Sequence, residues 1–339
     1  MGNYESTIKL ALLLTTTLIV SQTAFAVMPH FSSKSINVMQ ENAPMGTNND
    51  PISGLAYGAV NCNVAIWAGG LGSIAQQNPL SLNNGYRAKS LGSIYGLDYR
   101  SGLHDLYGFA FAVVNTNVYE LTDPDFATRI LGFNAMLYGS TILNTETLFA
   151  EWVILGAINQ NTSNGSINIS GNDIIVDSNY HNYQGGIRLN FGQITGSSSW
   201  TFSLVETIRY LFSYQPNNNQ LDNITALNIQ SQTFNNLLTL GGGVRVAFPG
   251  VDSWLSGSNE LRVIGTYDVV RPQNTMYANF IVGSKNFAVQ NPISPWGVEF
   301  GADFTCVFFD QIQIQFSYDF TLRNQYTNNS ASIKLRYIF

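Results

Sequence analysis

The chain ends in ASIKLRYIF, residues 331–339. Starting with Ala331, every second residue is apolar, whereas Lys334 and Arg336 lie at alternate positions and only Ile338 breaks the pattern. Side chains of an extended strand point to opposite faces with a period of two, so the segment predicts a strand with one apolar and one charged face. Left unpaired, such a strand would be an adhesive edge. The pattern therefore predicts that this terminal strand is covered in the folded protein.

The other end of the chain predicts export. Residues 1–26 have the order of a secretory signal peptide, with Lys9 ahead of an apolar run from Leu10 to Val20 and small residues near the end. The run is too short to span a bilayer as a helix. We expect cleavage between Ala26 and Val27, with an uncleaved anchor as the alternative, and we take the exporting cell to be a bacterium.

Composition narrows the class of protein. Charged residues make up 11% of the chain and hydrophobic ones 45%, with 30 Gly, 21 Phe and 17 Tyr. A soluble domain usually carries about 25% charge, and no second long apolar run follows the leader. These features are typical of a membrane β-barrel. The net charge of −6, without a basic cluster in the sequence, argues against nucleic-acid binding.

The alternating pattern recurs along residues 61–339. We predict an all-β fold, a twelve-stranded antiparallel transmembrane barrel of the outer membrane. Its strands are expected near 61–74, 86–100, 104–118, 127–140, 146–160, 179–192, 199–214, 237–248, 259–270, 296–306, 311–322 and 331–339. The even number places both barrel termini in the periplasm. Most connections after odd strands are long, so 160–178, 215–232 and 271–294 are predicted as outer loops.

Aromatic residues are expected to form a girdle at the periplasmic rim. These residues sit near the predicted strand ends: Tyr99, Tyr107, Phe191, Trp200, Phe248, Phe304 and Phe339.

Several blocks together resemble the β-domain of autotransporters, the type V secretion proteins. They are VAIWAGGLGS (64–73), LGSIYGLDYR (91–100) with a Gly-x-Asp-Tyr pattern, RILGFNAMLYGS (129–140), GGGVRV (241–246), ANFIVGSKNFAVQN (278–291), WGVEFGADF (296–304) and the terminal LRYIF. The resemblance implies an outer-membrane barrel that anchors or displays an N-terminal passenger at the cell surface. Here only residues 27–60 separate leader and barrel, so the passenger would be very short.

The resemblance also names partners. It implies contact with outer-membrane lipid, delivery by periplasmic chaperones, insertion by the barrel-assembly machinery and a monomeric barrel. The last strand would carry the assembly signal, with Tyr337 and Phe339 as its recognition end. The strand would then close on the first strand and lose its free edge.

Parity predicts which charges face the lumen. The inward set is Glu151, Arg188, Arg209, Arg245, Arg262, Asp268, Glu299, Asp303, Asp319, Lys334 and Arg336. Two interpretations stand: a mutually paired network that neutralises the interior, or the lining of a selective pore. The same parity sends Glu206 into lipid near mid-strand, where we expect a bulge or a basic neighbour to accommodate it.

The stretch before the barrel, residues 49–61, has features of a short helix in the lumen. Asp50 suits an N-cap and Pro51 the first helical position. An extended coil is the alternative. A disulfide between Cys62 and Cys306 is not expected, because about three strand spacings of 4.8 Å separate them around the wall, more than the roughly 7 Å of a bridge.

Enzyme signatures are absent from the sequence. His30, His104 and His181 have no catalytic partner at recognisable spacing, and neither a metal-ligand cluster nor a phosphate loop occurs. We expect no catalytic residue, metal or cofactor. The sequence favours a nearly passengerless autotransporter barrel, and two further functions remain open: a small-solute channel, and an adhesin acting through the outer loops.

Overall fold

The computed structural model describes residues 64–79, 85–101, 105–121, 127–143, 148–169, 172–197, 200–216, 220–221, 228–229, 233–249, 258–271, 274–280, 283–289, 294–308 and 312–339. Over these ranges, no helix is long and apolar enough to cross a membrane. The leader with its cleavage position, residues 27–60 with the expected lumenal helix, and Cys62 lie outside the described residues.

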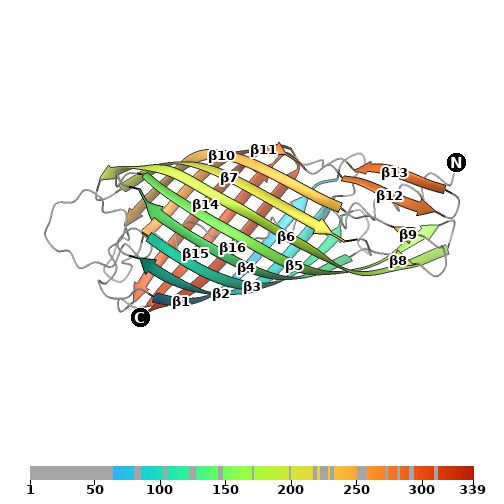
Figure 1. Cartoon of the computed structure of the whole chain (residues 1–339), viewed down its shortest axis with the longest axis horizontal. Helices are drawn as coiled ribbons and strands as arrows, with labels where there is room; N and C mark the ends of the chain where they lie inside the picture. Colours follow the sequence, from blue (N-terminus) through green and yellow to red (C-terminus); the bar gives the residue numbers. More distant parts are fainter. Residues whose placement is uncertain are drawn as a thin grey trace.

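Twelve strands close into an antiparallel barrel, which confirms the predicted fold (Figure 1). They are β1 (Val64–Gln77), β2 (Tyr86–Ser101), β3 (Asp105–Glu120), β4 (Ala127–Ile142), β5 (Leu148–Ile169), β6 (Asn172–Ser197), β7 (Trp200–Gln215), β10 (Thr233–Pro249), β11 (Ser258–Val270), β14 (Trp296–Phe308), β15 (Ile312–Arg323) and β16 (Tyr326–Ile338). Each strand pairs with its neighbours around the wall. The last strand pairs with the first from Ala65↔Ile338 to Gln77↔Tyr326, so the terminal edge is covered.

The strands alternate between an exposed and a buried face, with the polarity reversed from that of a soluble protein. In β14 the exposed residues Trp296, Phe300 and Phe304 are aromatic, whereas Glu299 and Asp303 are buried. Most of the large exposed side chains of the other strands are likewise apolar. Apolar side chains on the outer face lose no hydrogen bonds when lipid replaces water around the barrel. The inward polar groups can form hydrogen bonds and ion pairs with one another. The alternation thus fixes which face meets the bilayer.

Exposed tyrosines lie near both ends of the outward face of β3, at a spacing that suits the two interfaces of a bilayer. Tyr107 and Tyr119 lie twelve residues apart on β3, and both are exposed. Twelve residues span about 41 Å along a strand, or about 30 Å along the membrane normal at a tilt of about 40°. The other members of the predicted girdle lie at the same end of the barrel as Tyr107 and are exposed, except Phe248, which is half-buried and packs on Trp200 with ring centroids 5.2 Å apart.

The predicted outer loop at 160–178 differs from the structure. β5 and β6 remain paired through Ile169↔Asn172, so most of 160–178 is a strand extension and the loop prediction is wrong there. This segment contains Ile167, Ile169, Ile174, Ile175 and Val176, and β-branched residues favour strands even in an Asn-rich context.

A second sheet occupies the other two predicted loops. β8 (Gln220–Leu221), β9 (Asn228–Ile229), β12 (Asn274–Phe280) and β13 (Gly283–Val289) form a four-stranded sheet in the order β13-β12-β9-β8. It lies at the end of the barrel opposite the C-terminus (Figure 1).

One connection at that end is tight. Asn324 and Gln325 alone join β15 to β16, and Gln325 has φ 62°. A left-handed backbone is unfavourable for a residue with a Cβ. Gly85, ahead of β2, has φ 68°, and a Cβ there would lie 2.6 Å from the Gln77 carbonyl oxygen. That position requires glycine.

The residue that breaks the terminal pattern has a structural role. Ile338 faces inward and packs against Ala65 and Leu106 at the C-terminal end of the barrel. Cys306 is a free thiol on the outward parity of β14 and is half-buried. The predicted absence of a disulfide therefore holds for Cys306.

Candidate functional site in the lumen

The inward faces form two different walls. Side chains on β1 to β4 build a buried apolar cluster, to which Val153 and Leu155 of β5 add: Trp67, Leu71, Ile94, Ala110, Ala112, Val114, Met136 and Tyr138. Charged residues lie mainly on β5 to β16. All eleven charges predicted to face the lumen lie on inward parity and are buried or half-buried.

Sequence reasoning missed three further lumenal charges, Asp98, Glu260 and Arg323. The alternation of their strands could have assigned them to the lumen, because each lies on the same face as neighbouring residues that were predicted to point inward. With them, the lumenal residues whose exposure is described include seven cations (Arg188, Arg209, Arg245, Arg262, Arg323, Lys334, Arg336) and seven carboxylates (Asp98, Glu151, Glu260, Asp268, Glu299, Asp303, Asp319). The described lumenal charge is therefore balanced.

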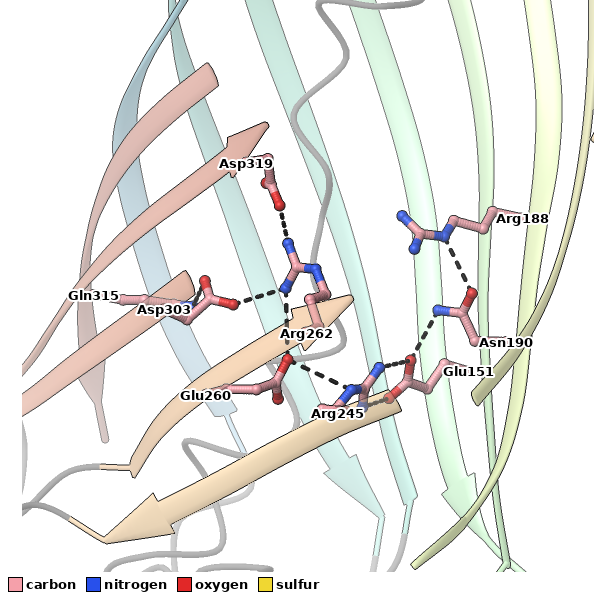
Figure 2. Close-up of polar contacts among 9 residues, drawn as sticks. All are labelled: Glu151, Arg188, Asn190, Arg245, Glu260, Arg262, Asp303, Gln315 and Asp319. Atoms are coloured by element: carbon pink, nitrogen blue, oxygen red, sulfur yellow. Dashed lines mark hydrogen bonds and ion pairs between the residues drawn. The ribbon is translucent and has the colours of Figure 1, made fainter. Parts of the chain in front are cut away.

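Six of these residues form what we call the central network: Glu151, Arg245, Glu260, Arg262, Asp303 and Asp319 (Figure 2). Arg245 of β10 binds Glu151 of β5 through two contacts, Nη1–Oε1 at 3.1 Å and Nη2–Oε2 at 3.3 Å. Its Nε lies 3.4 Å from Oε1 of Glu260 on β11. Since β6 and β7 stand between β5 and β10 in the wall, the first pair connects strands that share no backbone hydrogen bond.

Arg262 is the hub of the central network. Its Nη1 lies 2.8 Å from Oδ2 of Asp303 and 3.5 Å from Oε1 of Glu260, and its Nη2 contacts Asp319 of β15. Gly301 of β14 pairs directly with Arg262, and a Cβ there would lie 2.4 Å from the guanidinium Cζ. The glycine thus leaves the space that lets the guanidinium cross β14 and reach Asp319.

Neutral amides extend the network at both ends, as Figure 2 shows. Asn190 of β6 donates from Nδ2 to Oε2 of Glu151 at 2.9 Å and accepts from Nε of Arg188 at 3.1 Å. At the other end, Gln315 Nε2 donates to Oδ1 of Asp303 at 3.5 Å. The polar contacts therefore run without a break from β6 to β15.

Two more ion pairs lie towards the second sheet. Arg209 of β7 binds Glu299 of β14 in a fork, with both N–O distances 3.2 Å. Arg323 of β15 binds Asp268 of β11, with Nη2–Oδ1 at 3.1 Å, and Thr239 donates to the same oxygen at 2.8 Å. Both pairs again join strands that are not neighbours in the wall.

A second group, the seam cluster, surrounds the closure between β1 and β16: Trp67, Asp98, Tyr138, Lys334 and Arg336. Trp67 Nε1 donates to Oδ1 of Asp98 at 3.1 Å, and the Tyr138 hydroxyl also donates to that oxygen. Arg336 Nη2 lies 3.1 Å from Oδ2 of Asp98, and Lys334 Nζ is 4.2 Å from the Trp67 ring centroid. Asp98 thus links β2, β4 and β16 to the first strand.

The seam cluster gives structural meaning to two of the quoted motifs. In the Gly-x-Asp-Tyr block, Gly96 lies opposite Trp67, and a Cβ there would be 2.3 Å from the indole ring. The carboxylate of the same block, Asp98, binds Arg336 of the terminal LRYIF block. The two motifs therefore meet across β1.

The arrangement supports rigidity. Removing one member of a buried charge pair is strongly destabilising, typically by about 3–5 kcal/mol, because the partner is left uncompensated. No group of His, Cys, Asp or Glu among the described residues could hold a metal ion. The charged side chains of the central network and the seam cluster thus bind one another.

Three residues singled out from the sequence lie on the outer face. Tyr337 and Phe339 are exposed, with ring centroids 5.0 Å apart, and the Phe339 amide donates to the Val64 carbonyl at 3.3 Å. Glu206 is also exposed, opposite Phe191 and Gly242. The pairings of β7 with β10 and with β6 show no register shift at Glu206, and Glu206 forms no ion pair with a described residue. The prediction of a bulge or a basic neighbour at Glu206 is therefore wrong for the described part of the chain.

The closed antiparallel barrel of twelve strands, with an apolar outer face and a paired interior, defines a membrane-embedded β-barrel of the outer-membrane class. A family model described as "Autotransporter beta-domain" matches residues 66–319. The chain belongs to the autotransporter β-domain family.

Solved structures agree in fold. The chain is similar to the translocator domain of the autotransporter NalP from Neisseria meningitidis, at a TM-score of 0.61 and 11% identity over 94% of this chain and 98% of that one. It is also similar to the β-domain of the Bordetella autotransporter BrkA, at 0.57 and 12% over 82% and 100%. The transport unit of AIDA-I from Escherichia coli gives 0.55 and 13% over 86% and 100%. No curated protein sequence matches the chain.

Proposed function

We propose that this outer-membrane barrel acts as an anchor that displays the sheet β13-β12-β9-β8 and a very short N-terminal segment, and that it has no enzymatic activity. The observation that carries the proposal is the set of lumenal ion pairs between strands that are not neighbours. Such pairs brace the wall from inside and place ordered side chains across the bore. A braced, charge-balanced interior suits an anchor better than a wide solute pathway.

The proposal includes an orientation. Both chain termini of the barrel, at the start of β1 and the end of β16, face the periplasm, and the Asn324–Gln325 turn and the second sheet lie outside the cell. Long connections on that side and short ones on the other support this, as in other outer-membrane barrels. The outer loops 215–232 and 271–294, which contain the second sheet, are then the segments available to the surroundings.

The proposal also includes assembly as a monomer. The barrel-assembly machinery would read the last strand through the outward rings of Tyr337 and Phe339, after periplasmic chaperones deliver the unfolded chain. Exposed aromatic rings at a strand terminus offer a contact surface before closure. After closure, β1 covers the backbone edge of β16.

Orientation is tested by labelling single cysteines in intact cells, in a background without the two native cysteines. Asn324→Cys, in the exposed turn, should react with a membrane-impermeant maleimide. Ser101→Cys is the matched control, exposed at the opposite end of β2, and should react only after permeabilisation. The reverse labelling pattern would overturn the proposed orientation.

The bracing role is tested by conductance in planar bilayers. The wild-type barrel should conduct weakly, and Arg245→Gln, which removes a side chain that binds across the bore, should increase the conductance severalfold. Glu206→Gln, a charge removal on the outer face, should leave it unchanged. A wild-type barrel that conducts as well as the Arg245 variant would favour the solute-channel function instead.

A further inference from the structure

Three basic side chains on the outer face gather on two closely spaced strands, Arg87 and Lys89 on β2 and Arg129 on β4. All three are exposed. Every other Lys or Arg that lies in a barrel strand and has a described exposure is on inward parity. No ion pair joins any of the three to another described residue. Cations on a lipid-facing surface are costly unless an anion accompanies them.

The register places the three cations around one spot. Lys89, Asn117 and Arg129 lie directly opposite one another across β2, β3 and β4. Two strand spacings put the Cα atoms of Lys89 and Arg129 about 10 Å apart, and Arg87 is about 7 Å further along β2. Side chains as long as Lys and Arg can converge on a group bound between them.

One hydrogen bond already orients the site. Arg129 Nε donates to Oδ1 of Asn115 on β3 at 3.1 Å, which draws the guanidinium from β4 towards β2. Both terminal NH₂ groups of Arg129 remain for a ligand, since no contact with another described residue uses them. Asn117, half-buried on the same face, offers a further amide. An arginine fork, an ammonium group and amide donors together are the groups that recognise phosphate.

The depth of the site matches a lipid headgroup. Just below it the outward residues Leu91, Val113 and Leu131 are apolar, and Leu91 is 73% exposed. Lys89 is ten residues from the girdle residue Tyr99, about 34 Å along the strand and about 26 Å along the membrane normal, close to the height of the apolar band in such barrels. The cations therefore lie at headgroup level, with acyl chains below them.

We propose that Arg87, Lys89 and Arg129, with Asn115 and Asn117, bind the phosphate of a phosphorylated lipid whose acyl chains run along Leu91, Val113 and Leu131. A phosphorylated lipid fits both parts of this surface, because its phosphate can bind the cations at the edge and its acyl chains can contact the apolar side chains below them. Under the proposed orientation the lipid belongs to the outer leaflet. Only this leaflet assignment rests on the proposed function, because the site exists in either orientation.

The test uses purified full-length protein in neutral detergent micelles doped with bisphosphorylated lipid A, with bound lipid counted by native mass spectrometry. The wild type should bind one lipid A. The triple variant Arg87→Gln/Lys89→Gln/Arg129→Gln should need a mole fraction of lipid A on the order of 100-fold higher for the same occupancy, because each basic residue near an anionic surface contributes about 1 kcal/mol to binding. Heat-modifiable gel mobility reports that each variant is folded. If the triple variant does not fold, Lys89→Gln alone should show a severalfold loss.

The matched control is Arg271→Gln, which removes one cation after β11, on the opposite wall of the barrel. It should bind lipid A as the wild type does. Three results would overturn the proposed site. Wild type and triple variant could bind lipid A equally, or Arg271→Gln could lose as much binding as Lys89→Gln. The wild type could also bind phosphatidylcholine as well as it binds lipid A. Displacement of the lipid by inorganic phosphate alone would assign a free anion instead. The micelle assay is independent of orientation, so its failure is distinct from a failure of the cysteine labelling.

Discussion

Replacing Arg262 with Gln should destabilise the barrel more than any outer-face substitution. Arg262 contacts Asp303 at 2.8 Å, Glu260 at 3.5 Å and also Asp319, and Asp303 and Glu260 are almost completely buried. Each contact corresponds to about 4 kcal/mol of gross attraction at an effective dielectric constant near 20. Desolvation offsets most of this, so we expect a net loss of about 3–5 kcal/mol in the free energy of unfolding.

The measurement is guanidinium unfolding in phosphatidylcholine vesicles, approached from both the folded and the unfolded side and followed by tryptophan fluorescence. The expected loss corresponds to roughly two to four orders of magnitude in the unfolding constant. Arg129→Gln is the matched control and should cost no more than about 0.5 kcal/mol, since Arg129 is exposed, forms no ion pair with a described residue, and these vesicles lack the phosphorylated lipid proposed to bind it.

Charge is separated from packing by a compensating variant. Arg262→Gln/Asp303→Asn/Asp319→Asn removes the two carboxylates left unpaired and should recover at least half of the lost free energy. If the triple variant is no more stable than Arg262→Gln, or if Arg262→Gln costs no more than Arg129→Gln, the electrostatic account of the central network is wrong.

Four other predictions follow from single positions. Gly301→Ala should lower the free energy of unfolding by about 1–3 kcal/mol, because the new Cβ meets the Arg262 guanidinium, whereas Gly156→Ala, which faces open space, should be neutral. Phe339→Ala should reduce folded barrel in the outer membrane, seen by heat-modifiable mobility, far more than Ile338→Ala, and equal yields would refute the assembly signal. Glu206→Leu should raise stability by about 1–2 kcal/mol in the same unfolding assay, given the cost of an acid near the midplane, and a loss would reveal a bound partner. Gln325→Gly should add about 0.5–1 kcal/mol because the residue has φ 62°, and Asn324→Gly should give no gain.

The sequence by itself determined the barrel and its faces. A period of two is a local property that survives without knowledge of any partner, so the alternation ending at Phe339 predicted the strand, its lipid face and its inward charges. The same parity placed Glu151, Arg262 and Asp319 inside. The alternation also predicted twelve strands. The loop prediction at 160–178 was wrong because this segment is rich in Asn, whereas its β-branched residues favour a strand.

Only the tertiary structure decided which charges meet. Arg262 reaches Asp319 across β14 because Gly301 lies opposite it, and Asp98 meets Arg336 across β1 only because the barrel closes. The outer-face cations show the same dependence, since Lys89 and Arg129 are forty residues apart in sequence and lie in one row through the register of β2, β3 and β4. Pairing between strands depends on register and closure, which are set by the whole sheet at once, whereas the direction in which a side chain points is set by its own strand.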